Sequence, residues 1–504
     1  MLLSPRVTTP HLVDLAVILA YLAGITWFGA RFRRSQHSLR DYFLGGRTAP
    51  WWAIAFSIVS AETSTLTVIG TPSLAFNGNF GFLQVVFGYL VARVLIALLF
   101  LPHYFRGEMF TAYELMQRRF GERMRRFTAG VFLMLRALAE GVRAFALSIV
   151  IGVVLAPVYR EVGVAAWAEV GSILLIVALT LFYTFEGGMS AVIWTDVVQM
   201  VLYIGGAVLS FFVILGEIHG GWGHVLAAAG AAGKFQIFDF RVSAGAAFFA
   251  RNYSFWAGLI GGCFLTTASH GTEQLMVQRY LAAPSEADAR KALLGSWLVI
   301  FFQFALFLVI GAMLWVHYGD LHLAAPKLAD TLYPAFVWNN LPPGVAGLVI
   351  AAILAAGMSN LSAALNALAS TTIMDFHRPL AGHGAVSDTD QLRLARWATV
   401  AWGAVLVAIG LVARHWGSVL EAGLSIASVL YGSLLGVFFL GLLTRRVGEM
   451  AAIVAMAAGL VFMLYVKLGT HIAFTWWVPI GTLATFAVGL IASYWPRMDA
   501  NAHR

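Results

Sequence analysis

The chain has 504 residues, of which 60% are hydrophobic and only 11% are charged, against about 25% charged residues in soluble domains. With a mean hydropathy of +0.82, it has too few polar side chains to coat a water-soluble globule, and we predict a polytopic protein of the lipid bilayer. The single cysteine, Cys263, excludes an intrachain disulfide and a cysteine-based metal cluster. The net charge of +8 is what basic cytoplasmic loops produce, so it does not indicate a nucleic-acid partner.

Long apolar segments recur along the whole chain. A helix needs about 20 mostly apolar residues to cross a bilayer, and the sequence predicts an all-α protein with about 13 such helices. The predicted spans are Leu12–Phe32, Trp51–Phe76, Phe82–Tyr104, Phe127–Leu155, Val164–Tyr183, Ser190–Leu215, Tyr253–Gln274, Ala292–Tyr318, Gly344–Ile373, Trp397–Val412, Val419–Leu443, Ala451–Val466 and Phe474–Tyr494.

The basic residues lie mostly on one side of these spans. Most of the 32 Lys and Arg residues fall in the loops that follow odd-numbered spans. Because cytoplasmic loops carry the excess of Lys and Arg, we predict a multi-pass protein of the inner (plasma) membrane, with the N-terminus outside and the C-terminus in the cytoplasm.

The sequence contains no motif for chemistry on a bound substrate. A Walker A loop, an H-E-x-x-H helix and a G-x-S-x-G elbow are all absent from it. No long polar block separates a soluble domain from the apolar spans either. We therefore expect neither an enzyme nor an ATP-driven pump.

Polar residues gather in the second predicted span, where the bilayer makes them costly. Glu62 lies halfway along this span inside the hydroxyl-rich run Ser57–Thr67, and Gly70, Pro72 and Gly78 follow as helix breakers. Such a segment predicts a discontinuous helix whose freed carbonyls coordinate a cation. The alternative is that the hydroxyls bond to their own helix and that Glu62 pairs with an intramembrane arginine.

Two other spans contain polar groups that packing alone does not require. The ninth span has Ser359, Asn360, Ser362 and Asn366, although small residues there also let helices approach closely. In the sixth span, Asp196 indicates either a cation path or a carboxylate at the end of a helix. Hydroxyl, amide and carbonyl oxygens suit Na⁺, whereas no His and Cys grouping offers a transition-metal site.

The fourth span contains Arg136, Glu140 and Arg143 on one helical face. Their opposite charges predict a structural ion network, and a role in transport is the alternative.

Short motifs recur in order along the chain, from about Leu12 to Arg446. With them the sequence resembles the sodium:solute symporter family, which contains proline, sugar, monocarboxylate, vitamin and iodide carriers. The motifs are Asp41–Arg47 leading into Pro50–Trp52, Thr111–Leu115, Arg119–Gly121, Gly187–Gln199, His270–Tyr280, Ala287–Arg290, the ninth-span cluster that ends at Asp375, Tyr431–Gly436 and Leu440–Arg446.

The resemblance implies a LeuT-type fold, with two inverted repeats of five helices each. Residues 1–50 would then form an extra N-terminal helix and a cytoplasmic loop. Residues 51–215 would be the first repeat, residues 216–446 the second, and residues 447–504 two C-terminal helices with a short tail. The broken second span would pair by symmetry with the seventh, and the substrate would bind between them.

The resemblance also implies a main Na⁺ site. Carried over by motif position, this site consists of Ser60 and Thr63 in the second span, and Ala356, Ser359 and Asn360 in the ninth. Asn360 stands where the family usually has Ser or Thr, but its amide oxygen still accepts a cation. Glu62, Asp196 and Ser362 match positions along a cation path, where Glu62 also leaves proton coupling open.

The expected substrate pocket lies beside that site. Its residues are Thr67, Gln84, Thr266, Ser269 and Glu273, with a structural role at a helix end as the alternative for Glu273. We therefore predict a Na⁺-coupled symporter that imports a small polar organic solute by alternating access, with a monomer sufficient for function. The alternatives are a proton-coupled symporter and a solute sensor that has lost tight coupling.

Overall fold

A computed structural model gives the fold of the chain and describes residues 9–31, 45–106, 112–161, 163, 167–183, 189–242, 245–377, 388–416 and 418–494. In these ranges the chain is helical and contains no strand, as predicted. Some residues of the predicted spans and motifs lie outside the described residues, namely Phe32, Asp41–Leu44, Thr111, Val164–Ala166 and Gly187–Gly188.

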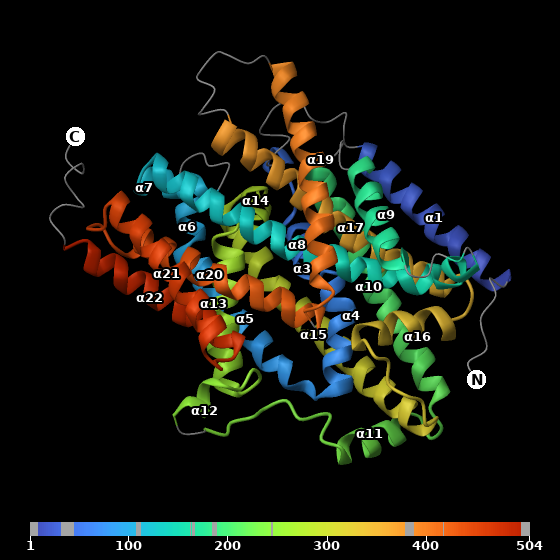
Figure 1. Ribbon diagram of the computed structural model, residues 1–504. Coiled ribbons are helices and arrows are strands. Elements are labelled where there is room, and N and C mark those ends of the chain that lie inside the picture. Colours follow the sequence, from blue (N-terminus) through green and yellow to red (C-terminus); the bar gives the residue numbers. More distant parts are fainter. Residues whose placement is uncertain are drawn as a thin grey trace.

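The helices form one bundle (Figure 1). In chain order they are α1 (Thr9–Ala30), α3 (Trp51–Glu62), α4 (Thr65–Asn77), α5 (Leu83–Leu99), α6 (Leu101–Tyr104), α7 (Tyr113–Arg119), α8 (Glu122–Glu161), α9 (Ala168–Tyr183), α10 (Met189–Glu217), α11 (Gly221–Ala231), α12 (Ala246–Phe249), α13 (Gly262–Gly271), α14 (Gln274–Leu281), α15 (Glu286–Asp320), α16 (Leu332–Asn340), α17 (Val345–Thr371), α19 (Asp388–Ala413), α20 (Val419–Leu443), α21 (Glu449–Gly469) and α22 (Trp477–Ala492).

The long apolar helices agree with most of the predicted spans. Seven helices of the described chain are long and apolar enough to cross a membrane, or eight when the bent pair α3 and α4 counts as one span. The shorter apolar helices Leu12–Ile25, Ala168–Leu181, Val345–Leu354 and Trp397–Ala413 coincide with the first, fifth, ninth and tenth predicted spans. The total of 13 stays a prediction, because the seventh predicted span contains only short helical pieces.

The second span is discontinuous, as its polar run predicts. Helix α3 ends at Glu62, Thr63 and Ser64 are extended, and α4 begins at Thr65 after a bend of 64°. The expectation that Gly70 and Pro72 break the helix is wrong, since both lie inside α4. There α15 packs so closely against α4 that a side chain at Gly311 would collide with the Pro72 carbonyl, and this packing supports the helical turn.

The seventh span is interrupted as well. Helix α13 ends at Gly271 and α14 begins at Gln274, with Glu273 extended between them. Before α13, a π-helical turn over Ala257–Gly261 runs beside α5. Two neighbouring spans of the bundle core therefore share one feature, a break that frees backbone groups inside the protein.

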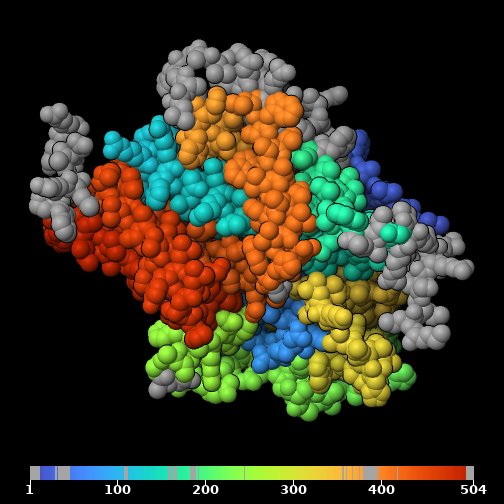
Figure 2. Space-filling model, viewed as in Figure 1, coloured from blue at the N-terminus to red at the C-terminus, as the bar shows by residue number. Residues whose placement is uncertain are grey.

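The remaining helices enclose these two broken spans. Helix α3 packs against α10 and α15, and α4 also packs against α15. Helices α20, α21 and α22 pack on one another at one side, and α1 packs against α17 at the other (Figure 1). Figure 2 shows α19 and the group α20–α22 covering one face of the molecule. Helices α11 and α12 lie at the end that the charge distribution assigns to the outside.

Helix α5 packs closely on α13 and on the π-helical turn before α13. This packing depends on glycine residues. A Cβ at Gly88 would lie 2.6 Å from the Leu259 carbonyl oxygen, and one at Gly258 would lie 2.6 Å from the Gln84 Cβ. We expect Gly88→Ala to destabilise the protein by about 1–3 kcal/mol, because backbone atoms must move to make room. Thermal unfolding of the purified protein in detergent measures this loss.

Gly205→Ala is the matched control. Gly205 is also helical, in α10, and a Cβ there would meet no atom within 4 Å. This variant should keep or slightly raise the melting temperature, since alanine favours a helix over glycine by about 1 kcal/mol. Equal melting temperatures for the two variants would contradict the packing argument.

Candidate functional site

The break between α3 and α4 exposes backbone carbonyls inside the protein. The Thr63 amide donates to the Val59 carbonyl at 2.8 Å and is the last such bond of α3. Within the described chain, no backbone amide donates to the carbonyls of residues 60–63. Ser60 and Thr63 are both buried. These carbonyl oxygens therefore need another partner in a region that the bilayer keeps dry.

Helix α17 faces this break. A side chain at Gly357 would collide with the Thr65 hydroxyl, so the backbone of α17 lies directly against the start of α4. The Thr65 hydroxyl is buried and has no hydrogen-bond partner among the described residues, whereas the Thr63 hydroxyl accepts from Gln303 Nε2 at 2.6 Å.

Asn360 lies three residues beyond Gly357, on the same face of α17. Its side chain is 5% exposed, and its Nδ2 atom has no partner among the described residues. Ser362 is half-buried, while the side chains of Ala356 and Ser359 lie outside those that the structure describes.

The groups that meet at the break fit Na⁺. The carbonyls of residues 60–63 and the Thr65 hydroxyl, which have no partner among the described residues, are neutral oxygen ligands, whereas the unpartnered atom of Asn360 is the N–H donor Nδ2, which a water or a carbonyl satisfies. No cluster of three or more His, Cys, Asp or Glu residues offers a transition-metal site in the described chain.

Glu62, the last residue of α3, pairs with an intramembrane arginine. Its Oε2 atom lies 2.5 Å from Arg93 Nη2 and 3.3 Å from His270 Nε2. Arg93 is fully buried and also donates to the Ser296 hydroxyl at 3.2 Å. On the other side of His270, the Ser269 hydroxyl lies 2.8 Å from Nδ1. This is the pairing that the alternative interpretation of Glu62 predicts, and its role in a cation path stays a prediction.

Asp196 joins three helices through a buried ion pair. Its Oδ2 atom accepts from the Ser57 hydroxyl of α3 at 2.6 Å and from Arg279 Nη2 of α14 at 3.0 Å. Arg279 Nε also donates to the Ser57 hydroxyl at 2.9 Å, and all three side chains are buried. The cation-path role of Asp196 likewise stays a prediction. Sequence reasoning missed Arg279 as its partner, although Arg279 lies in one of the family motifs.

Glu273 occupies the break between α13 and α14 and is held there by two partners. It accepts hydrogen bonds from Arg136 and from the Tyr431 hydroxyl, the latter at 3.0 Å. Arg136 also pairs with Glu140 at 2.8 Å, and Glu140 pairs with Arg143. The ion network predicted for the fourth span is confirmed and extends to Glu273, whose contacts agree with the structural alternative without testing a role in solute binding.

None of the remaining expected substrate residues lines the cavity described below. Gln84 donates to the carbonyls of Gly81 and Tyr253 at 3.1 and 2.8 Å, and it accepts from the Asp239 amide at 2.9 Å. Thr67 and Thr266 are buried in α4 and α13. The substrate-binding roles of Thr67, Gln84, Thr266, Ser269 and Glu273 therefore stay predictions.

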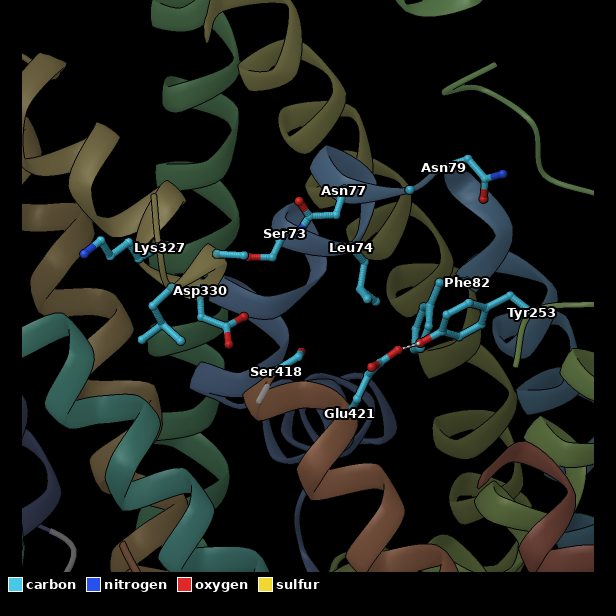
Figure 3. Close-up of a pocket in the computed structure, with 13 residues that line it drawn as sticks. Ser73, Leu74, Asn77, Asn79, Phe82, Tyr253, Lys327, Asp330, Ser418 and Glu421 are labelled. Carbon is cyan, nitrogen blue, oxygen red and sulfur yellow. Dashed lines mark hydrogen bonds between the residues drawn. The ribbon is translucent and has the colours of Figure 1, made fainter. Parts of the chain in front are cut away.

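A cavity of about 490 Å³ opens beyond the outer end of α4, and we call it the outer cavity (Figure 3). The Tyr253 hydroxyl donates to Glu421 across it at 2.8 Å. Sequence reasoning missed this site. Its acidic residues lie in a loop and in the first turn of a span, where charged side chains are common and do not by themselves indicate a site. Its lining residues are Ser73, Leu74, Asn77, Gly78, Asn79, Phe82, Tyr253, Lys327, Leu328, Ala329, Asp330, Ser418 and Glu421.

The bundle, its two broken spans and its oxygen-lined break define a class of membrane transporter. The profile of the sodium:solute symporter family matches residues 42–459, so the chain belongs to this family. It is accordingly a sodium-coupled symporter and not an enzyme.

Known proteins similar to the chain support this assignment. It is 28% identical to the sodium/sialic acid symporter NanT of Aliivibrio fischeri, over 94% of the chain and 92% of that protein. It is 29% identical to the sodium-coupled monocarboxylate transporter 2 of Mus musculus, over 89% of the chain and 71% of that protein. A solved structure of a Na⁺-coupled sialic acid symporter, substrate-bound and outward-open, matches with a TM-score of 0.80 and 25% identity, over 96% of the chain and 98% of that one.

Removing one partner of the Asp196–Arg279 pair should be costly. We expect Asp196→Asn to destabilise the protein by about 3–5 kcal/mol, because the Arg279 charge is then left buried without compensation. The double variant Asp196→Leu with Arg279→Met should recover much of this loss. Chemical or thermal unfolding of the purified protein measures all three proteins.

The partly exposed pair Arg290–Glu286, with side chains 41% and 34% exposed, serves as the control, because its N–O distance of 2.5 Å is also that of an ion pair. Arg290→Ala should cost less than about 1 kcal/mol, since water screens a surface pair. An Asp196→Asn loss as small as that of Arg290→Ala would contradict the structural role of the buried pair.

Proposed function

We propose that the chain imports a small organic anion together with Na⁺ by alternating access. The observation that carries the Na⁺ part is the set of unpartnered oxygens at the break between α3 and α4, opposite α17. The carbonyls of Ser60 and Thr63, the Asn360 side chain and, in the same turn of α17, Ala356 and Ser359 would hold the ion. Bound Na⁺ supplies the energy of its gradient, to which a membrane potential of 100 mV adds about 2.3 kcal/mol per charge.

The residues around the two breaks position the moving parts. Thr63 and Ser64 form a two-residue hinge, so α4 can change its angle to α3 without loss of a helical hydrogen bond. At the other break, Glu273 ties α8 to α20 through Arg136 and Tyr431. These contacts close the end of the bundle that the charge distribution assigns to the cytoplasm. They have to separate before a solute leaves on that side.

The anionic character of the solute is supported by two observations. The relatives named above carry sialic acid and monocarboxylates, and the sodium/iodide cotransporter of Homo sapiens is 28% identical over 90% of the chain. In addition, α8 places Arg143 at the edge of its ion network with a side chain 20% exposed and a buried Nε that has no hydrogen-bond partner in the described part of the chain. A guanidinium with an N–H group that lacks an acceptor is suited to bind the carboxylate of a solute.

The placement in the membrane completes the proposal. The charge distribution favours the plasma membrane, with the N-terminus outside and the C-terminus in the cytoplasm. The interrupted second and seventh spans support two inverted repeats over residues 51–215 and 216–446. All the residues assigned to Na⁺ and solute belong to one chain, so a monomer is sufficient.

Asn360→Ala should weaken Na⁺ binding at least about tenfold, because the amide oxygen that we propose as a ligand is then lost. A tenfold change in affinity corresponds to about 1.4 kcal/mol. Titration of the purified protein with Na⁺, followed by the fluorescence of its 16 tryptophans, measures the half-saturating concentration. K⁺ replaces Na⁺ as the ionic control.

Asn340→Ala is the matched control variant, because Asn340 is exposed at the end of α16. It should titrate like the unmodified protein. Unchanged Na⁺ affinity in Asn360→Ala would show that the break does not hold the ion there. A response to pH instead of Na⁺, lost in His270→Gln, would assign coupling to protons through Glu62 and His270.

An inward Na⁺ gradient should drive uptake of radiolabelled carboxylates, such as sialic acid or lactate, into proteoliposomes that contain the protein. A K⁺ gradient should not, and a neutral hexose should not enter. Arg143→Gln should lower the uptake about tenfold if Arg143 binds the carboxylate. Uptake of the hexose at the rate of the carboxylates would refute the assignment of an anion.

A further inference from the structure

The outer cavity contains a buried carboxylate with an unused oxygen. Asp330, in the short 3₁₀ turn Ala329–Thr331, is 1% exposed. Its Oδ2 atom accepts from the Val419 amide at 3.0 Å, whereas its Oδ1 atom has no hydrogen-bond partner in the described chain. A desolvated carboxylate of this kind is stabilised by a positive ion.

Two serine hydroxyls line the same cavity as Asp330. The Ser418 hydroxyl is buried and has no hydrogen-bond partner among the described residues, and the Ser73 hydroxyl of α4, whose residue is 3% exposed, donates to the Ile69 carbonyl at 3.3 Å. Figure 3 shows Asp330, Ser73 and Ser418 at one side of the cavity, with Glu421 and Tyr253 across from them.

The backbone of α4 is shaped to admit this cluster. A Cβ at Gly70 would lie 2.8 Å from the Leu420 Cβ and 3.7 Å from Asp330 Oδ1. Glycine at this turn therefore lets both the start of α20 and the Asp330 carboxylate approach α4. The close approach places Oδ1 against α4, the helix that also contributes the Ser73 hydroxyl to the cavity. This is a built polar site rather than a chance group of surface acids.

We propose that the outer cavity binds a monovalent alkali cation, Na⁺, through Asp330 Oδ1 and the hydroxyls of Ser418 and Ser73. Oxygen donors are the ligands that this class of cation takes. A divalent cation fits less well, because Ca²⁺ takes 6–8 oxygens, several of them from carboxylates. Here the Glu421 carboxylate is already bonded to Tyr253, and Lys327 adds positive charge at the exposed rim.

This site is separate from the proposed Na⁺ site at the break. Ser73 lies about 14 Å along α4 from Ser64, at 1.5 Å per residue. No ion can contact both sites at once. A volume of about 490 Å³ leaves room for several waters, each of which occupies about 30 Å³ in the liquid. The outer cavity would therefore hold a partly hydrated ion before it reaches the break.

Equilibrium binding of ²²Na⁺ to the full chain in lipid nanodiscs tests the proposal. The unmodified protein should bind Na⁺ at two classes of site, one with weaker and one with tighter affinity. Asp330→Asn should lose the weaker class, Ser418→Ala should weaken that class about threefold to tenfold, and Asn360→Ala should lose only the tighter one. Asp320→Asn is the matched control, because Asp320 ends α15 outside the outer cavity and pairs with His224 at 3.0 Å.

The outcomes separate this proposal from the proposed function. Loss of one class in Asp330→Asn, with an unchanged melting temperature, supports the outer site even if Asn360→Ala changes nothing. Binding in Asp330→Asn and Ser418→Ala equal to that of Asp320→Asn and of the unmodified protein overturns it. Should Asp330→Asn fail to fold, Ser418→Ala alone decides, because it removes one hydroxyl and leaves the charge in place. Anomalous scattering from Rb⁺-soaked crystals should place an ion beside Asp330 Oδ1, and its absence there refutes the site.

Discussion

The structure depends on one constraint, the need to satisfy backbone carbonyls where a helix stops inside the bilayer. Water satisfies such carbonyls at the end of an ordinary helix, but the membrane interior has none to offer. At the break after Glu62 the carbonyls of residues 60–63 have no amide partner in the described chain. Neighbouring groups therefore have to be polar, yet the buried Thr65 hydroxyl and Asn360 Nδ2 donate to none of these carbonyls. A cation completes such a set more readily than any further side chain.

Both broken spans also place a carboxylate at the break and neutralise it with an arginine from another helix. Glu62 ends α3 and pairs with Arg93 of α5, while Glu273 separates α13 from α14 and pairs with Arg136 of α8. Without its arginine partner, each buried carboxylate would destabilise the folded protein by several kcal/mol. Paired, it fixes the distance between two helices. The arginines thus hold these helices together in the conformation seen here.

The sequence permits some of this to be predicted and leaves the rest open for physical reasons. The hydroxyl-rich run around Glu62 predicted a broken helix, because polarity is a local property of the chain. The position of the break was not predicted, since it depends on tertiary contacts of Thr63 with Gln303 and of Thr65 with the turn at Gly357. The pairing of Asp196 with Arg279 and the outer cavity likewise arise only when distant segments meet.

Helix α4 connects the two sites, and its two ends are held differently. At its outer end, Lys234 is 7% exposed and donates to the Phe76 carbonyl at 2.6 Å, which places a positive charge at the negative end of the helix dipole. At its inner end, α4 begins at an extended two-residue hinge with no side-chain cap. A tilt of α4 would therefore change the inner site most, while the outer end moves together with the segment that contains Lys234. An ion bound near Asp330 and an ion bound near Asn360 would each stabilise a different angle of the same helix, and this is a physical route by which their order of binding could set the direction of transport.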